Sequence, residues 1–428
     1  MRKESALDLE ALEIFIRSQS LDFGAAILEK ALEGVGEGRR DEPLVCANNH
    51  LPCRMESLGR QTKTIRTVLG PISFTRSAFR CPRCGAIHRP GDEALGVVGT
   101  GFSPGVRRMM ARAGSRESFE IASQDLHFYA RLEVGAKDVE RMAEKTGAQV
   151  ADWMARQGSL ALGSAAACES LEPQQTLYVS FDGTGIPMRG SELQGVKGKG
   201  EDGRARTREV KLGCVFTQTK LDAEGRPERD PASTTFIGGI ESSADFGNRL
   251  HAEAVRRGLR AARRTVALTD GAAYNKSIIA EHFPHATHII DLYHAQEHLA
   301  EFIRDAARQP IHGELHLACQ ALLDAGDIDA LAATLRGTLP RSGSRRADGE
   351  KKIRYFTSNA AQMRYGAFRA QGLFVGSGVI EAGCKTVIGR RLKQSGMFWT
   401  VRGANEIIAL RCCLYSNRLE QFWEDAAA

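Results

Sequence analysis

Residues 176–187 read TLYVSFDGTGIP, an apolar run that reaches an acid and then turns through two glycines. Residues of this kind favour a β-strand, and the glycines after Asp182 indicate a tight turn. An acid at the carboxyl end of a buried strand lies in the crevice where α/β sheets place their sites. The stretch therefore predicts an α/β fold with Asp182 at its site.

The same pattern returns twice. Residues 264–275 read RTVALTDGAAYN, with a strand at 266–268 that leads to Asp270. Residues 285–299 read HATHIIDLYHAQEHL, where a strand ends at Asp291 and a helix with His294 and His298 follows. A single Asp-Gly pair is more often only a turn, so the repetition after strands is what favours a site.

A further acid comes from residues 372–399, GLFVGSGVIEAGCKTVIGRRLKQSGMFW, where a glycine-rich loop leads into a helix that carries Glu381. Three carboxylates from separate elements match the oxygen ligands of two Mg²⁺ or Mn²⁺ ions, which catalyse displacement at phosphorus. Basic residues follow that would hold a phosphodiester backbone without reading its sequence. They are Lys385, Arg390, Arg391, Lys393 and Arg402.

The N-terminal region predicts a helical segment at 1–40, ended by the run GVGEGRRDEP, and a metal-binding module at 41–100. Residues 62–79, TKTIRTVLGPISFTRSAF, read as two strands joined by a turn, and CPRCG follows with Cys81 and Cys84. Two cysteine turns held by a hairpin are typical of a zinc ribbon. Cys53 is the third expected ligand, and the fourth is either His50 or Cys46. The alternative is a hairpin without metal.

Residues 101–165 show helical periodicity, with a turn at Val134 and Gly135. Two helices joined in this way fit a DNA-binding helix-turn-helix, and a plain helical hairpin fits equally well. The second helix carries Lys137, Arg141 and Lys145 on one face, with acids among them. The Ala- and Gly-rich stretch 157–175 reads as a linker between domains.

Composition adds a mild preference for a polyanionic partner. The chain has 428 residues, a formal net charge of +6 and a pI near 8.8. A second basic run reads as one helix and fits either a solvated face or a nucleic-acid contact; it comprises Arg256, Arg257, Arg260, Arg263 and Arg264. We expect no membrane span and no signal peptide, and the ten cysteines then favour a reducing compartment.

Several strings resemble the insertion-sequence transposases of the ISKra type, bacterial relatives of the Mutator-like transposases. They include YVSFDGTGIP, REVKLGCVFTQT, TDGAAYN, IIDLYHAQEHL, GSGVIEAGCKTVIGRRLKQSGMFWT and GANEIIALRC, and they cover about 177–428. LGPISFTRSAFRCPRCG and PGDEALG resemble the N-terminal region of the same family. One departure is that Met55 and Glu56 follow Cys53 where many relatives carry a second cysteine.

The resemblance implies an RNase H-like catalytic core at 176–428, with a helical insertion at about 296–372. It implies that Asp182, Asp270 and Glu381 are the catalytic triad of a DDE transposase, a mobile-element enzyme. Asp291 and His294 then match the acid-and-histidine signature of the family. His294 is expected to contact DNA or orient the metal site, unless it is a histidine satisfied in the core.

The expected function is thus cleavage and joining of transposon ends. The partners would be double-stranded DNA, comprising terminal inverted repeats and target, and a second subunit, because two ends must be held in a dimer or larger assembly. The expected location is the bacterial cytoplasm, with the nucleoid. Two alternatives stay open: an RNase H-like nuclease or resolvase, and a DNA-binding regulator descended from a transposase.

Overall fold

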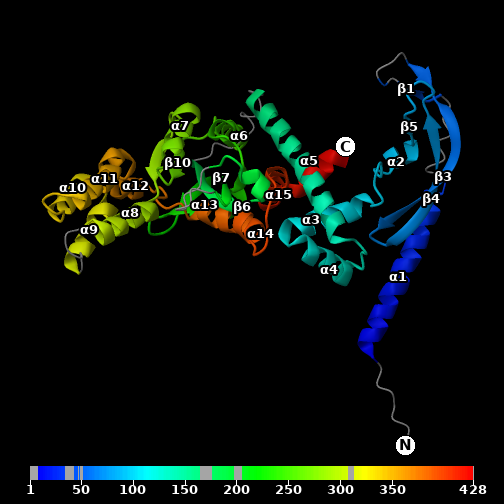
Figure 1. Ribbon diagram of the computed structural model, residues 1–428, viewed down its shortest axis with the longest axis horizontal. Helices are drawn as coiled ribbons and strands as arrows, with labels where there is room; N and C mark the ends of the chain where they lie inside the picture. Colours follow the sequence, from blue (N-terminus) through cyan, green and yellow to red (C-terminus); the bar gives the residue numbers. More distant parts are fainter. Residues whose placement is uncertain are drawn as a thin grey trace, which may run out of the picture. The chain divides into compact units, whose positions relative to one another are not determined.

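The computed structural model describes residues 8–33, 43–46, 48, 52–163, 176–196, 205–306 and 313–427 (Figure 1). The chain forms two compact units, Met1–Ala143 and Glu144–Ala428. Their boundary falls inside one long helix, α5 (Ala136–Gly163). Helices and a mixed sheet both contribute, which confirms the predicted α/β class.

The first unit begins with α1 (Leu9–Leu32), whose C-terminal part packs on a hairpin of β3 (Glu56–Thr67) and β4 (Gly70–Arg80). Ile65, Ile72 and Phe74 form the core of this contact. Gly70 lies in the turn with φ 126°, a conformation that favours glycine. The hairpin and the N-terminal helix agree with the prediction, whereas the expected linker at 34–42 lies outside the described residues.

Short elements complete this end of the unit. β1 (Val45–Cys46) pairs antiparallel with β2 (Cys53–Arg54), and β5 (Ile87–His88) pairs with β4. α2 (Pro90–Ala94) follows, and its buried Asp92 binds Arg76 at 2.8 Å. These pairings and the apolar contacts around Cys81 bring β1, β2 and the segment 81–88 together.

Three helices follow: α3 (Pro104–Arg116), α4 (Phe119–Ala130) and α5. Val106, Met110 and Val139 are fully buried between them. The turn between α4 and α5 falls at the predicted place, and Arg131 begins it with φ 53°. The linker predicted at 157–175 is wrong in its first part, because α5 continues to Gly163; residues 164–175 lie outside the described range.

The second unit contains a six-stranded sheet in which β7 lies between β6 and β9, and β6 continues through β10 to β11. β6, β10 and β11 are parallel, and β7 is antiparallel to its neighbours. The strands are β6 (Thr176–Pro187), β7 (Thr207–Leu221), β8 (Pro227–Arg229), β9 (Thr235–Gly239), β10 (Thr265–Thr269) and β11 (Thr287–Ile290).

Two helices supply the apolar residues of the core beside this sheet. Phe246 and Leu250 of α6 (Ser243–Arg256) and Ile278 of α7 (Ala273–His282) pack against Phe181 of β6. The basic run predicted to lie in one helix does not: α6 ends at Arg256, and the chain turns at Gly258 with φ 96° before β10. Glycine at this positive φ ends the helix.

The segment between β11 and Glu381 is helical, as expected for residues 296–372. It comprises α8 (Leu292–Asp305), α9 (Glu314–Ala325), α10 (Ile328–Gly337), α11 (Ser344–Ser358) and α12 (Tyr365–Ala370). Figure 1 shows these helices gathered in yellow and orange beyond the sheet.

The C-terminal part returns to the sheet. α13 (Gly378–Gly383) continues through a π-helical turn, η5 (Cys384–Gly389), into α14 (Arg390–Leu392). α15 (Val401–Tyr415) packs on β9 and is followed by α16 (Leu419–Ala427). Within the described part of the chain, no helix combines the length and apolarity needed to cross a membrane.

Candidate functional site

Strand register brings the three predicted aspartates to one edge of the sheet. Leu268 of β10 pairs with Ser180 of β6, so Asp270 lies level with Asp182. Thr269 pairs with Ile290 of β11, which places Asp291 level with Asp270 in the same way. Because the three strands are parallel and adjacent, the three acids lie side by side, with Asp270 and Asp291 just past the ends of β10 and β11. The tight turn predicted after Asp182 is wrong: β6 continues to Pro187, and Gly183 and Gly185 pair with β7 as strand residues.

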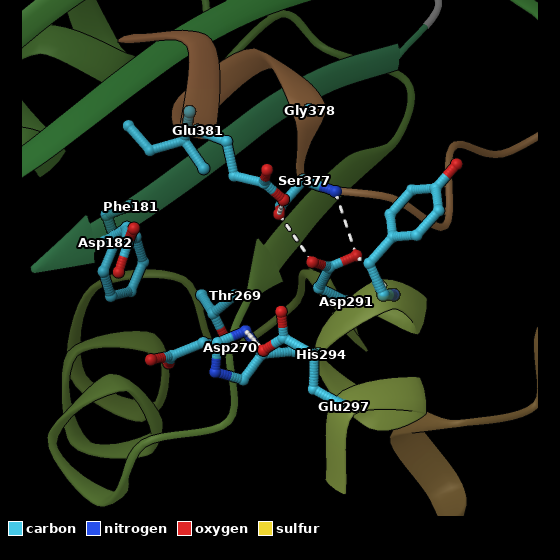
Figure 2. A pocket seen from close by; sticks show the side chains of 12 residues that line it. Phe181, Asp182, Thr269, Asp270, Asp291, His294, Glu297, Ser377, Gly378 and Glu381 are labelled. Carbon is cyan, nitrogen blue, oxygen red and sulfur yellow. Dashed lines mark hydrogen bonds and ion pairs between the residues drawn. The ribbon is translucent and has the colours of Figure 1, made fainter. Parts of the chain in front are cut away.

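α13 brings Glu381 to the same place. A cavity of about 410 Å³ is lined by residues from β6, β10, the start of α8 and α13. Asp182, Asp270, Asp291, His294 and Glu381 all line it, and Figure 2 shows them around one opening. The structure thus brings together all the acids that the sequence singled out, together with His294.

Asp182 is half-buried, and its carboxylate has two short-range partners. Oδ1 accepts a hydrogen bond from the backbone N–H of Gly183 at 2.6 Å, and Oδ2 lies 3.7 Å from Sγ of Cys384. Burial raises the pKa of Asp182, and the negative charge of Asp270 raises it further. The neighbouring negative charge that raises the pKa of Asp182 would also attract a cation to this place.

Asp270 is held by its own following turn. Its Oδ1 accepts hydrogen bonds from the backbone N–H of Ala272 at 2.9 Å and from the side-chain amide of Asn275. Asn275 is fully buried, so its amide is a fixed donor. Both hydrogen bonds end on Oδ1. They fix the orientation of the carboxylate and thereby also the position of Oδ2.

Ser377 connects Asp291 with Glu381. Its Oγ lies 2.6 Å from Oδ2 of Asp291 and 2.9 Å from Oε1 of Glu381, while its backbone N–H donates to Oδ1 of Asp291 at 3.1 Å. Both carboxylates are directed at this one serine in Figure 2. A hydroxyl has a single proton to donate, so it cannot satisfy two carboxylates at once. It donates to one of them at a time, to Oδ2 of Asp291 or to Oε1 of Glu381.

The donor chemistry of the cavity fits a hard divalent cation, since carboxylate oxygens are the preferred ligands of Mg²⁺. The side-chain positions do not yet converge. No three of the described carboxylates around the cavity bring oxygens within 4.8 Å of one another. Glu381 would have to turn from Ser377 toward Asp182 and Asp270 to share an ion with them.

The basic residues predicted to contact phosphate occupy two kinds of position. Lys385, Arg390 and Lys393 are exposed on η5, on α14 and just beyond it, and Lys393 donates to Oγ1 of Thr184. Arg402 is 86% exposed and binds Glu406 at 2.8 Å. These four side chains are on the surface.

Arg391 differs from that expectation. Its side chain has no exposed area, and its guanidinium lies 5.1 Å from the centroid of the Trp399 ring. A side chain without exposed surface cannot reach a DNA backbone, so in this structure Arg391 supports the packing of α14. Because α14 is helical, Arg390 and Arg391 face different sides although they are neighbours in sequence.

The first unit holds a separate cluster of cysteines. The sulfurs of Cys46, Cys81 and Cys84 lie within 4.8 Å of one another and could bind a metal such as zinc. Sγ of Cys53 lies 3.3 Å from Sγ of Cys81, and Sγ of Cys46 lies 3.8 Å from that of Cys84. Of the two residues expected as fourth ligand, Cys46 lies in this cluster, and His50 lies outside the described residues.

Hydrogen bonding prepares one of these thiols for a cation. Burial raises the pKa of Cys81, but hydrogen bonds from the backbone N–H of Cys84 and the Cys53 thiol oppose it and bring the value down to about 6. Burial and the neighbouring Cys81 raise the pKa of Cys53. One thiolate thus forms readily at neutral pH, which is the form that binds metals.

Three residues of the candidate site were not predicted from the sequence: Asn275, Ser377 and Cys384. Asn275 follows Asp270 by five residues, and Ser377 precedes Glu381 by four, which is one helical turn. The spacing of Ser377 was a readable signal, because residues four apart lie on one helix face. No comparable signal marked Cys384.

A comparison of the sequence with models of protein families finds no match, and a comparison with curated proteins finds none either.

Proposed function

We propose that the protein is a DNA transposase of the DDE type, with Asp182, Asp270 and Glu381 as its metal ligands. One observation carries the proposal: Asp182 within β6 and Asp270 at the end of the adjacent parallel strand β10 lie at the same level, and Glu381 lines the same cavity. The strand order β9-β7-β6-β10-β11, with only β7 antiparallel to its neighbours, is in accord with an RNase H-like core.

The chain's own groups prepare the site for phosphoryl transfer. Two Mg²⁺ ions, when bound, would supply charge for both the attacking and the leaving oxygen. Asp182 and Asp270 concentrate negative charge at the sheet edge, and Asn275 fixes the orientation of Asp270. Ser377, anchored on Asp291 through its backbone N–H, can donate its hydroxyl proton to Glu381 at the opposite wall, and Glu381 would turn inward to serve as a ligand.

DNA would reach the cavity along the exposed cations beside it. Lys385, Arg390 and Lys393 lie on the segment that directly follows Glu381, so a phosphate backbone contacting them passes the carboxylates. We assign no such contact to Arg391. His294 lines the cavity, with Nδ1 3.7 Å from Glu297, in a position to contact the bound strand.

The first unit would contribute to DNA binding. We propose that Cys46, Cys53, Cys81 and Cys84 hold one Zn²⁺ in a zinc ribbon, and that α4 and α5 form a helix-turn-helix. Four thiolates are a complete ligand set for a structural zinc. Two subunits or more would be needed to hold two transposon ends, and the enzyme would act at the bacterial nucleoid.

The test compares cleavage and joining at a transposon end by wild type and three single variants, Asp182→Asn, Asp270→Asn and Glu381→Gln. Each keeps its size and loses the negative charge that holds a cation. We expect each variant to be folded, to bind DNA and to lose at least about 100-fold in rate, because removal of a ligand takes away several kcal/mol of transition-state stabilisation.

Two results would contradict this assignment. A variant that cleaves and joins near the wild-type rate removes that residue from the ligand set. Wild-type protein that nicks DNA in Mg²⁺ but never joins a 3′ end to target DNA would be an RNase H-like nuclease rather than a transposase.

A further inference from the structure

The second basic run of the sequence has no part in the cavity described above. Arg264 directly precedes β10, and Asp270 directly follows it. A strand of five residues is about 17 Å long. The two lie at opposite ends of the same strand, so a phosphate held at one end is not the one held at the other.

Six arginines gather at this end of the sheet, and we refer to them as the arginine corner. Arg256 ends α6, and the turns that follow hold the next four; the sixth comes from the segment between α15 and α16. They are Arg256, Arg257, Arg260, Arg263, Arg264 and Arg418. Arg260, Arg263 and Arg264 are exposed.

One carboxylate neutralises part of the buried side of the corner. Glu253 is 6% exposed and accepts two hydrogen bonds from Arg256, at 2.6 and 2.8 Å. Nη1 of Arg418 lies 3.7 Å from the same carboxylate. Arg257 interacts electrostatically with the carboxylates of Glu253 and Asp230 over a longer distance. Six arginines against two carboxylates leave a clear excess of positive charge.

The buried part of the corner is also incompletely hydrogen-bonded. Arg418 is 7% exposed and stacks 4.5 Å from the Trp153 ring, yet its Nη2 has no partner among the described residues. Nε of Arg257 is buried and likewise has none there. A buried N–H group without an acceptor is costly, and native proteins retain one mainly where a ligand or water completes it.

We propose that the arginine corner binds backbone phosphates of a nucleic acid, as a second contact separate from the carboxylate cavity. A phosphate offers acceptor oxygens and a charge that match planar guanidinium donors. The half-buried Arg257 would bind one phosphate and the exposed arginines would bind its neighbours, whereas the buried guanidinium of Arg418 contributes positive charge behind them. The proposal does not rest on the catalytic assignment, because it concerns binding alone.

The experiment measures binding of a labelled 30-base-pair duplex by fluorescence anisotropy in EDTA, over a series of salt concentrations. The variant combines Arg257→Gln, Arg263→Gln and Arg264→Gln. Removal of one phosphate-binding arginine should reduce the salt slope by about 0.9, so we expect a decrease of about 2.7 for the three, alike for unrelated DNA sequences. Arg226→Gln is the matched control, since Arg226 is exposed in the β7–β8 turn and bound to Asp222.

The same measurement can overturn the proposal. A salt slope equal to wild type in the folded triple variant would exclude DNA from the corner. Inorganic phosphate provides a second arm: if it raises the melting temperature of wild type but not of the triple variant, while the DNA slope of the triple variant is unchanged, the ligand is a free phosphate and not a nucleic acid.

Two further variants separate DNA binding at the arginine corner from effects on folding and on catalysis. Should the triple variant fail to fold, the Arg263→Gln, Arg264→Gln double variant tests the fully exposed arginines alone, with an expected decrease in slope of about 1.8. Asp270→Asn should bind with the wild-type slope, so loss of cleavage and loss of corner binding are separate outcomes.

Discussion

Ser377 shows how much of the site depends on a single hydroxyl. Its Oγ lies within hydrogen-bond distance of Asp291 and of Glu381, so this one hydroxyl links the two carboxylates. If Glu381 is a metal ligand, Ser377 positions it without touching the reacting atoms. Groups that orient a ligand from behind commonly change metal affinity by about 10–100-fold.

Ser377→Ala should therefore raise the Mg²⁺ concentration for half-maximal DNA cleavage by roughly 10-fold, with a smaller effect at saturating Mg²⁺. Ser377→Thr keeps the hydroxyl and should stay near wild type. A Mg²⁺ titration of cleavage rate measures both. An equal loss of rate at every Mg²⁺ concentration in Ser377→Ala would indicate a structural role instead.

Cys81 sets the pH dependence of the cysteine cluster. Its pKa in the folded protein is about 6, below the ordinary pKa of a thiol. The thiolate therefore contributes its full stability at a pH above the ordinary thiol pKa and loses that contribution as the pH falls through 6. Cys46 and Cys53 have raised pKa values, and their protons must leave when a metal binds. Zinc affinity should consequently rise with pH throughout the range 6–9.

A competition titration with a chromogenic chelator at several pH values measures this affinity. Cys81→Ser should lose stoichiometric zinc, whereas Cys319→Ala, a buried cysteine of α9, should retain one ion per chain. Affinity that does not change between pH 6 and 8 would show that the thiols are not the ligands.

At the scale of elements, α5 and α15 meet through a glycine. A Cβ at Gly147 would lie 2.0 Å from the carbonyl oxygen of Glu406, a backbone atom that cannot move cheaply. Glycine inside a helix is ordinarily unfavourable by about 0.5–1 kcal/mol relative to alanine. The close approach of the two helices explains why glycine is nevertheless used.

Gly147→Ala should for this reason lower the free energy of unfolding by about 3 kcal/mol, the upper part of the range for overpacking. Gly163→Ala in the same helix is the control, because no atom lies within 4 Å of its added Cβ. Urea unfolding of both variants measures the difference. Equal stability of the two would mean that α5 and α15 are not packed as described.

Strands and helix ends were predictable because their residues carry local signals. The acids after β10 and β11, the turn before α5 and the hairpin near Gly70 all follow from such patterns, whereas β6 runs past Asp182 because its glycines pair with β7. The length of α5 did not, since an Ala- and Gly-rich stretch has no strong local preference and its packing decides. The burial of Arg391 under Trp399 likewise depends on a contact across eight residues.

At the scale of the whole molecule, the two units differ in the interactions that stabilise each of them internally. The second unit has an extensive apolar core around β6 and α6. The cysteine end of the first unit has only Cys46, Met55 and Cys81 as buried core residues among those that the structure describes. So small a core rarely stabilises a fold by itself, and a metal usually supplies the missing free energy.

Removal of zinc should thus loosen one end of one unit and leave the rest intact. We expect faster amide hydrogen exchange at residues 52–56 and 79–88 after treatment with a zinc chelator, because these segments surround the cysteines. Residues 62–75 should stay protected, since α1 packs on that end of the hairpin through Ile65, Ile72 and Phe74. β6, β7 and β10 should exchange as before.

Hydrogen exchange of the full chain, read by mass spectrometry, measures all these segments at once, and Cys84→Ser should reproduce the chelator pattern without any chelator. Unchanged exchange at 79–88 in both samples would mean that the apolar contacts suffice and that the cysteines hold no structural metal.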